Sequence, residues 1–570
     1  MPSAETRDRL LFRHCHVTLD TGKGRNTYTE RLAWMVGGRG KYSEFHHLEG
    51  FKGKGNFRNI EGLLLLPNGD VKKIKKESLK ISSRARRGIL FSDLYLAEWT
   101  LTNLEVGTIV FLEYEQTTAV ARHFIPLYIQ HSRYAVDEVH VTAEAGSDFM
   151  VTIKPYAAEG CVEMVNDRHA VGRELPVWED RPYTGGFSDT ATRVLIHYYP
   201  PGHPSSWQDE AEEYEELWSG VYQPTEGQSN TGTRDALATL LPEFEKTYRY
   251  VAVEIGEGGI IPHELEEIRE YQYGDCKDLS LLLVDELIQR GYHAEPVLTS
   301  LPANRTFYPE YPEMFQFNHA IVGWIEDGDT LYHDPTGEEF QAGEIPWQLQ
   351  GAPVLWMGEE GGLAWIPLDP DPLDISIQLN GTVDEDGVVQ GRAVWRYDSR
   401  MRRELQDVLD DLDESDLNNR FVDEIDMTIV AWQTDPDSLT LQLEATLTGL
   451  IQPLGSRLLF RPFPFAVSSV PEAKEPGPDG FILPRPEASH GTIHLKLPWQ
   501  VENQTIPADS LVNEVGTVSA SFSVSDNTLT GRWFIARNKH KFSADKSHQL
   551  QVFLAAINDL SRKRVFLTTE

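Results

Sequence analysis

The sequence has 570 residues, 40 % of them hydrophobic and 25 % charged, which is typical of a globular protein. At roughly 150 residues per domain, this length predicts three or four domains. Asp and Glu outnumber Lys and Arg by 88 to 52, and the resulting net charge of −36 repels phosphate backbones and anionic lipid surfaces. We therefore expect no nucleic-acid partner. No run approaches the roughly 18 consecutive apolar residues of a membrane-spanning helix, so no transmembrane segment is expected.

The N-terminal residues and the cysteines do not decide the cellular compartment of the protein. Residues 1–15 lack the apolar core of a secretory signal. The protein would be cytoplasmic if Met1 is the native start, and periplasmic or exported if a signal has been removed. Three cysteines, Cys15, Cys161 and Cys276, are too few for a disulfide scaffold, and the odd count leaves at least one thiol free. We expect all three to be free.

Residues 1–190 show a strand pattern. Short runs rich in β-branched and aromatic residues alternate with turn signals about every dozen residues, such as the Pro-Asn-Gly-Asp sequence at 67–70. This spacing predicts a β-sandwich domain. The region also contains a basic stretch from Lys72 to Arg87. We interpret it as a solvated strand pair rather than an anion site, because no aromatic residues interleave with the charges.

The pattern becomes helical after residue 205. Helices are predicted over residues 207–218, 233–246, 262–271 and 276–290. The last helix has the strongest signal, and Gly291 ends it. Strands are predicted over 294–299, 318–324 and 330–333. The mixture predicts an α+β core domain over residues 191–366.

Prolines in the sequence Pro-Leu-Asp-Pro-Asp-Pro at 367–372 predict a linker. Residues 373–570 are again strand-rich, with helical insertions near 401–412 and 417–426 and a closing helix from about residue 547. The whole chain is thus predicted to be a multidomain α+β protein. It would consist of a β-sandwich over 1–190, an α+β core over 191–366 and a C-terminal β-rich domain with helical insertions over 373–570.

Cys276 has the sequence context of a nucleophile. Asp275 is placed as the N-cap of the predicted helix and Asp278 falls at N3, which is a capping-box arrangement. Cys276 is then the first helical residue, where the helix dipole and free N–H groups stabilise a thiolate and can hold a developing oxyanion. The alternative is that Cys276 is a small buried apolar residue, as many free cysteines are.

His319 is the candidate base, and Asp334 is the candidate for orienting it. A strand containing His319 is followed by a second strand that ends at His333. If the two strands pair through a turn of even length, Ile321 faces Asp334, and Asp334 then lies diagonally beside His319 on the same sheet face. A carboxylate behind a histidine is the third member that a thiol triad requires. A lone strand histidine can also be purely structural.

Other histidines fit a functional site less well. His333 points to the sheet face opposite to Asp334, which makes it a poor base. His263 lies near a helix start and is either structural or part of the cleft. His14 and His16 flank Cys15 on a strand, but they supply only two ligands, so no metal site is expected.

Three motifs together resemble those of bacterial transglutaminase-like domains, which belong to the papain-like thiol superfamily. The motifs are Gly-Asp-Cys-Lys-Asp at 274–278, Asn-His-Ala at 318–320 and Asp-Pro-Thr at 334–336, and the order Cys, His, Asp matches that superfamily. The N-terminal β-rich region resembles a domain of unknown function that commonly precedes such cores in bacteria. The specific motifs cover only about residues 248–340.

The resemblance implies a catalytic triad and an acyl-transfer reaction. Cys276 would be the nucleophile, His319 the general base and acid, and Asp334 the orienting carboxylate. An aromatic or amide side chain upstream of the nucleophile would bind the oxyanion, and Tyr250 is the candidate. The substrate would be a peptide bond or a glutamine-type amide in a peptide or protein, with hydrolysis favoured over cross-linking and without a cofactor. A non-catalytic binding or scaffold protein with a relic core is the alternative. The oligomeric state is unknown.

Overall fold

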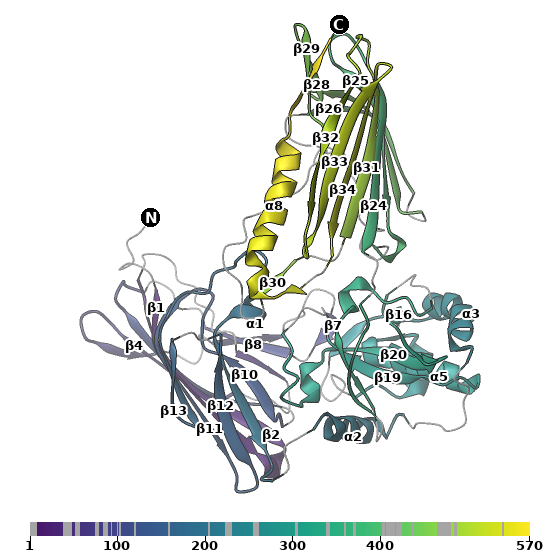
Figure 1. The fold of residues 1–570 in the computed structure, drawn as a ribbon. Coiled ribbons are helices and arrows are strands. Elements are labelled where there is room, and N and C mark those ends of the chain that lie inside the picture. Colours follow the sequence, from purple (N-terminus) through teal and green to yellow (C-terminus); the bar gives the residue numbers. More distant parts are fainter. Residues whose placement is uncertain are drawn as a thin grey trace.

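The structure is a computed structural model, shown in Figure 1. It describes residues 8–569 except for 38–47, 52–56, 75–78, 84–88, 93, 100, 102–103, 119–120, 158–159, 203–205, 223–230, 255–260, 302–305, 338–341, 358–360, 369–371, 402–404, 406–416, 418–424, 436–437, 464–479, 484–486 and 539–540. Half of the basic stretch and most of the two predicted helical insertions therefore lie outside the described residues.

The N-terminal part is built from β-sheets. Its elements are β1 Arg9–Asp20, η2 Thr21–Lys23, β2 Arg25–Met35, β3 Leu48–Phe51, β4 Phe57–Leu65, β5 Val71–Lys73, β6 Leu79–Ser83, β7 Ile89–Ser92, β8 Leu94–Trp99, β9 Ile109–Thr117, β10 Phe124–Tyr128, β11 Ala135–Ala145, β12 Met150–Tyr156, β13 Val162–Asn166, β14 His169–Leu175, α1 Phe187–Thr190 and β15 Arg193–Tyr199. Eight strands form one sheet in the order β13-β14-β11-β1-β2-β9-β4-β5, and three more form the sheet β10-β15-β12.

The two larger N-terminal sheets share one hydrophobic core. Alternating residues along β1 and β11, such as Val17 and Val141, face inward. They pack in one cluster with Ile153 of β12 and Ile196 of β15. Strand β15 begins at Arg193, beyond the predicted domain boundary at residue 190, and it pairs with both β10 and β12. The division into three domains stays a prediction.

The central part combines helices with a five-stranded sheet in the order β21-β20-β19-β22-β23. Its elements are α2 Trp207–Trp218, α3 Thr233–Thr247, β16 Arg249–Tyr250, β17 Ala252–Glu254, α4 Leu265–Tyr271, β18 Tyr273–Gly274, α5 Cys276–Gln289, β19 Glu295–Thr299, η5 Met314–Gln316, β20 His319–Glu326, β21 Asp329–His333, η6 Trp347–Leu349, β22 Pro353–Trp356 and β23 Gly362–Trp365. Helix α5 packs its leucines against this sheet, which anchors the start of the helix beside strand β20 (Figure 1).

The C-terminal part contains a second eight-stranded sheet, β26-β27-β25-β24-β31-β34-β33-β32, with helix α8 along one face (Figure 1). Its elements are β24 Leu373–Val383, β25 Val389–Tyr397, η7 Ser399–Met401, β26 Asp426–Asp435, β27 Thr440–Thr448, β28 Ile451–Leu454, β29 Arg457–Phe460, β30 Phe481–Ile482, β31 Glu487–Lys496, β32 Gln504–Val512, β33 Gly516–Ser525, β34 Thr528–Arg537, β35 Lys541–Phe542, η8 Ala544–Lys546, α8 Ser547–Arg562 and β36 Val565–Thr568. Helix α8 begins where the sequence predicts it.

The prediction of an α+β fold with a transglutaminase-like α+β core is wrong. Strands account for 49 % of the structure and helices for 20 %, so the protein is mainly β, with several sheets. Two of the missed strands, β22 and β23, belong to the central sheet. They are four-residue apolar runs beside Gly or Pro, too short to show a strand period, and their pairing is visible only in three dimensions.

Candidate active site

The start of helix α5 is fixed by a capping box. The Asp275 carboxylate accepts the N–H groups of Lys277 and Asp278, and the Asp278 carboxylate accepts the N–H of Asp275 at 3.1 Å. Asp275 also forms a buried ion pair with the Lys277 ammonium. Cys276 is the first residue of the helix, as the sequence predicts, and its own N–H lies outside the capping box.

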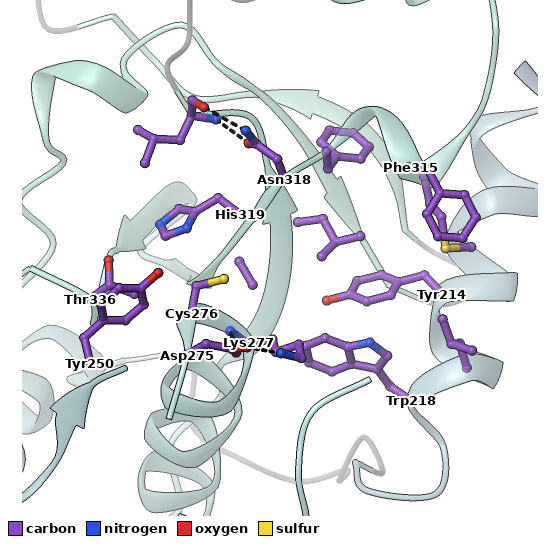
Figure 2. Close-up of a pocket in the computed structure, with 16 residues that line it drawn as sticks. Tyr214, Trp218, Tyr250, Asp275, Cys276, Lys277, Phe315, Asn318, His319 and Thr336 are labelled. Atoms are coloured by element: carbon purple, nitrogen blue, oxygen red, sulfur yellow. Dashed lines mark hydrogen bonds and ion pairs between the residues drawn. The ribbon is translucent and has the colours of Figure 1, made fainter. Parts of the chain in front are cut away.

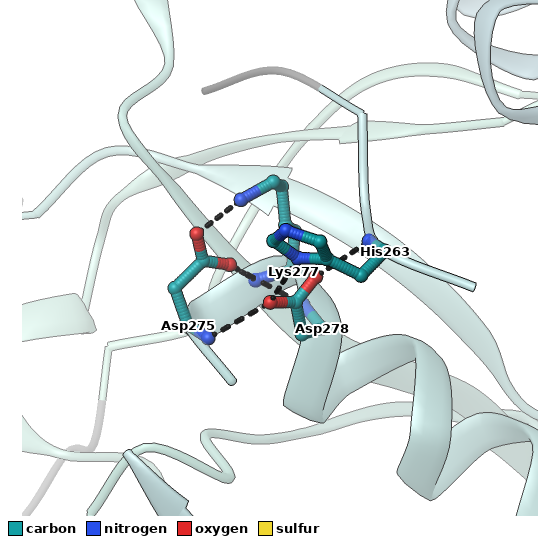
Figure 3. A network of polar contacts seen from close by, with 4 residues as sticks. All are labelled: His263, Asp275, Lys277 and Asp278. Carbon is teal, nitrogen blue, oxygen red and sulfur yellow. Dashed lines mark hydrogen bonds and ion pairs between the residues drawn. The ribbon is translucent and has the colours of Figure 1, made fainter. Parts of the chain in front are cut away.

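His263 extends this network, which Figure 3 shows. Its backbone N–H donates to Asp278 at 2.9 Å, and its Nδ1 lies 3.0 Å from the other Asp278 oxygen. Asp278 is almost completely buried, whereas the His263 ring is partly exposed. His263 does not line the pocket described below. It therefore holds the segment before α4 against the nucleophile helix, so among the sequence-based alternatives the structural role fits it.

Strands β20 and β21 bring His319 and Asp334 together. Ile325 pairs with Thr330 and Glu326 with Asp329, so the two strands have the predicted register around a two-residue turn. His319 Nε2 lies 3.0 Å from Asp334 Oδ2, and both side chains are buried. The other Asp334 oxygen accepts the Thr336 N–H at 3.0 Å and the Thr336 hydroxyl at 2.7 Å. Both Asp334 oxygens are thus engaged, which fixes the orientation of the carboxylate.

The charges of His319 and Asp334 stabilise each other and outweigh the effect of burial on their pKa values. Burial by itself would lower the pKa of His319, but the Asp334 carboxylate and then the Cys276 sulfur oppose it and raise the pKa to about 10. Burial raises the pKa of Asp334, but His319 and Thr336 more than offset this and hold it well below its usual range. The pair is therefore an imidazolium and a carboxylate at neutral pH.

A pocket of about 300 Å³ joins the nucleophile to the histidine (Figure 2). Cys276 and His319 both line it, and so do Tyr250 and Thr336 on one side of Cys276. The opposite wall is apolar and aromatic. Its residues come from α2, β19 and the segment around η5: Tyr214, Leu217, Trp218, Leu298, Met314, Phe315 and Phe317. Leu301, which follows β19, also lines the pocket.

Tyr214 and Asn318 line the pocket, but neither is among the site residues predicted from the sequence. Tyr214 lies on α2, about sixty positions before the nucleophile, and no local signal distinguishes it from a core tyrosine. Asn318 precedes His319, and its side-chain amide exchanges two hydrogen bonds of 2.8 Å with the backbone of Leu301 (Figure 2). The Asn-His pair was visible in the sequence, but the partner of the amide was not.

The remaining candidates lie away from this pocket. His14 and His16 both contact the Thr142 hydroxyl, and Cys15 is buried on the other face of β1. His333 is buried and pairs in register with Val322. All three cysteines are free. Within the described ranges, no group of three or more His, Cys, Asp or Glu side chains is arranged to hold a metal ion. No described helix has the length and apolar character needed to cross a membrane.

Comparisons with known proteins give a fold but no family. No protein-family model and no curated protein matches the sequence. A crystal structure from Parabacteroides distasonis, provisionally described as a protease, covers 99 % of this chain and 100 % of its own, with 12 % identity and a TM-score of 0.61. Leukotriene A4 hydrolase from Saccharomyces cerevisiae covers 38 % of this chain and 36 % of its own at 10 % identity and a TM-score of 0.21. An M1 zinc metallopeptidase from Deinococcus radiodurans covers 38 % of this chain and 54 % of its own, with 9 % identity and a TM-score of 0.19. The first likeness shows a shared fold, and the other two are too distant to carry an argument.

Proposed function

We propose that the protein is a thiol-dependent acyl-transfer enzyme in which Cys276, His319 and Asp334 act as nucleophile, acid and base, and orienting carboxylate. The observation that carries the proposal is the buried hydrogen bond between His319 and Asp334, in a pocket shared with a cysteine at a helix start. A structural histidine needs neither an oriented carboxylate nor a thiol beside it. The three motifs that resemble those of transglutaminase-like domains contain the same three residues.

The proposed reaction begins with attack of Cys276, as the thiolate paired with the His319 imidazolium, on the carbonyl carbon of an amide. A C–S bond forms and the carbonyl oxygen becomes an oxyanion. When the oxyanion collapses, the C–N bond breaks and the leaving nitrogen takes the proton of the His319 imidazolium. Because Asp334 raises the pKa of His319, the ring carries that proton at neutral pH.

The second half of the reaction requires His319 to act as a base. The Cys276 sulfur contributes to the raised pKa of His319 through its charge and hydrogen bond. A thioester has no such charge, so this contribution disappears in the acyl-enzyme and the imidazole is no longer held as strongly in its protonated form. It can then take a proton from an incoming water or amine, and the sulfur leaves with the electron pair of the C–S bond.

Amide hydrolysis in peptides or proteins is the preferred version of this proposal. The Parabacteroides structure of the same fold is provisionally described as a protease, which favours water as the acceptor. The aromatic wall opposite Cys276 favours an acyl donor with apolar groups next to the reacting carbonyl, because burying those groups there removes apolar surface from water. No step needs a cofactor.

Trapping the acyl-enzyme tests the proposal. The wild type and Cys276→Ser would be mixed with a library of unstructured peptides, quenched in acid and weighed by intact-protein mass spectrometry, with and without a fluorescent primary amine. We expect an adduct on Cys276 of the wild type only, and cleaved peptides rather than amine-labelled ones. The proposal fails if no adduct forms and Cys276 reacts with iodoacetamide no faster than the partly exposed Cys161. That result would favour the scaffold alternative.

A further inference from the structure

The Tyr214 hydroxyl is a buried polar group without a hydrogen-bond partner among the described residues. The side chain is only 1 % exposed and packs edge-on against Trp218, with 5.0 Å between the ring centroids. A buried donor that is left unpaired lowers stability, and a phenylalanine would fill the same space without that cost. The hydroxyl therefore calls for an explanation other than packing.

The position of the hydroxyl supplies that explanation. Tyr214 lines the same pocket as Cys276, and Figure 2 shows its hydroxyl directed into the pocket toward the Cys276 sulfur. Burial is the largest cause of the raised pKa of Tyr214, followed by the neighbouring Tyr222 and then by Cys276, which is close enough to contribute. The shift holds the pKa well above its usual value and keeps the phenol a neutral O–H donor.

We propose that the Tyr214 hydroxyl donates a hydrogen bond to the oxyanion that forms when Cys276 attacks a substrate carbonyl. This inference rests on the proposed acyl-transfer function and adds a catalytic residue to it. Among the described residues the donor has no partner in the resting enzyme, and it would gain one when negative charge develops on the carbonyl oxygen. A donor that is already desolvated and oriented needs no reorganisation at that moment, which is the condition under which such donors accelerate a reaction most.

The second donor is the Cys276 backbone N–H. The capping box engages the N–H groups of Lys277 and Asp278 and does not use that of Cys276. An N–H at a helix start also carries the positive end of the helix dipole. The backbone donor and the phenol together would bind one oxygen from two sides, as the two donors of an oxyanion hole do.

Tyr250, the candidate from sequence, is less suited to this role. Its side chain is 45 % exposed, so water competes for its hydroxyl and the surrounding dielectric is higher. Figure 2 places it beside Thr336, on the opposite side of Cys276 from Tyr214. Tyr250 also has interactions of its own in the structure. Its place at the exposed side of the pocket fits contact with the substrate chain better than contact with the oxyanion.

The test separates reactions that form an oxyanion from reactions that do not. Acylation of Cys276 by p-nitrophenyl acetate passes through a tetrahedral oxyanion, whereas alkylation by iodoacetamide does not. Tyr214→Phe removes only the hydroxyl. We expect the p-nitrophenolate burst of this variant to slow by about 10²–10³-fold, while its alkylation rate stays within about twofold of the wild type. Its melting temperature should be unchanged or higher, because an unpaired buried group is gone.

Tyr332→Phe is the matched control. Tyr332 is a fully buried tyrosine of strand β21 in the central sheet, but it does not line the pocket, so its variant should keep the wild-type burst. An equal burst in Tyr214→Phe and the wild type would overturn the role of Tyr214 as an oxyanion donor but not the proposed acyl-transfer function. Parallel loss of acylation and alkylation in Tyr214→Phe would show a packing role and also overturn it. A wild type without any Cys276-dependent burst would overturn the proposed function together with this inference.

Discussion

Replacing Asp334 with Asn tests the electrostatics on which the proposed mechanism depends. The variant keeps an oxygen that can accept the bonds from Thr336, but it removes the negative charge behind His319. Asp334 and Cys276 raise the pKa of His319 from 6.5 to about 10 against the effect of burial. At 1.36 kcal/mol per pKa unit, this rise corresponds to about 5 kcal/mol in favour of the imidazolium.

Without the carboxylate, only Cys276 opposes the effect of burial, so the pKa of His319 should fall to its ordinary value of about 6.5 or below it. At pH 8 the protonated fraction of the ring would then drop from about 99 % to about 3 % or less. The variant would lack the proton for the leaving nitrogen and the counter-ion for a thiolate. Loss of the orienting carboxylate in a related triad costs about 10⁴-fold in turnover, and a loss of that order is expected here.

Two alkylating reagents of similar size but different charge can report the protonation of His319. Iodoacetate is an anion that the imidazolium attracts, whereas iodoacetamide is neutral, so the ratio of their rates at Cys276 follows the charge on the ring. We expect the ratio for the wild type to stay constant up to about pH 9 and to fall near pH 10. The ratio for Asp334→Asn should fall already near pH 6.5 or below.

Asp329→Asn is the control for this experiment, because it removes an exposed carboxylate from strand β21, which ends just before Asp334, and should leave the ratio unchanged. Identical pH profiles for the wild type and Asp334→Asn would refute the reasoning.

The pH dependence of stability gives an independent test of the raised pKa of His319. A histidine whose pKa is raised in the folded state stabilises it fully below pH 6.5, and that stabilisation is lost between pH 6.5 and about 10. The variant should therefore lose less stability over this interval than the wild type.

Two further predictions concern residues near the pocket. Burial raises the pKa of Glu313 from 4.5 to about 7. Between these pH values the folded state holds more protons than the unfolded state, so the free energy of unfolding falls as pH rises. Glu313→Gln should remove about 3 kcal/mol of this fall, as measured by urea unfolding at pH 5 and pH 8. An equally steep fall in the variant would contradict this. A Cβ at Gly274 would lie 2.5 Å from the Asp278 Cβ, so Gly274→Ala should lower the free energy of unfolding by about 1–3 kcal/mol and slow alkylation of Cys276. Gly146→Ala is the control, because a Cβ there has nothing within 4 Å, and it should change neither quantity.

Local physics made part of the site predictable. The capping box places Cys276 at a helix start whatever the surroundings, because Asp275 and Asp278 satisfy the helix N–H groups within four residues. The relation between His319 and Asp334 follows from strand parity across a short turn. Both predictions depend only on neighbours in sequence or on one hairpin. The structure has the predicted helix start and register, while the catalytic roles of these residues stay a proposal.

Features that depend on distant parts of the chain could not be predicted. Tyr214 reaches the pocket only because α2 packs against the central sheet, and in the sequence it is one of several aromatic residues on an amphipathic helix. Strand β15 pairs with the N-terminal strands, although it follows helix α1 and lies next to a helical region. The mainly β character was missed because long-range pairing, rather than local period, defines short strands such as β22.

Two buried glutamates show how the pocket wall depends on the rest of the protein. Glu313 accepts the backbone N–H groups of His123 and Phe124, at the start of β10, at 2.7 and 2.9 Å. Glu210, on the helix that carries Tyr214, accepts the Met314 N–H at 2.6 Å. Both carboxyls are buried, and burial raises the pKa of Glu210 to about 8. The short helix η5 is thus held between the N-terminal sheet and α2.

This arrangement links the N-terminal sheets to the chemistry proposed for the central part. Met314 and Phe315 of η5 line the pocket, and the chain reaches His319 only four residues after Phe315. Phe124 of β10 also stacks on Tyr311, with 4.7 Å between the ring centroids, just before η5. A central part cut away from the N-terminal sheets would leave the Glu313 carboxyl and this aromatic contact without partners. The N-terminal part is therefore a structural component of the pocket wall, in addition to any recognition role of its own.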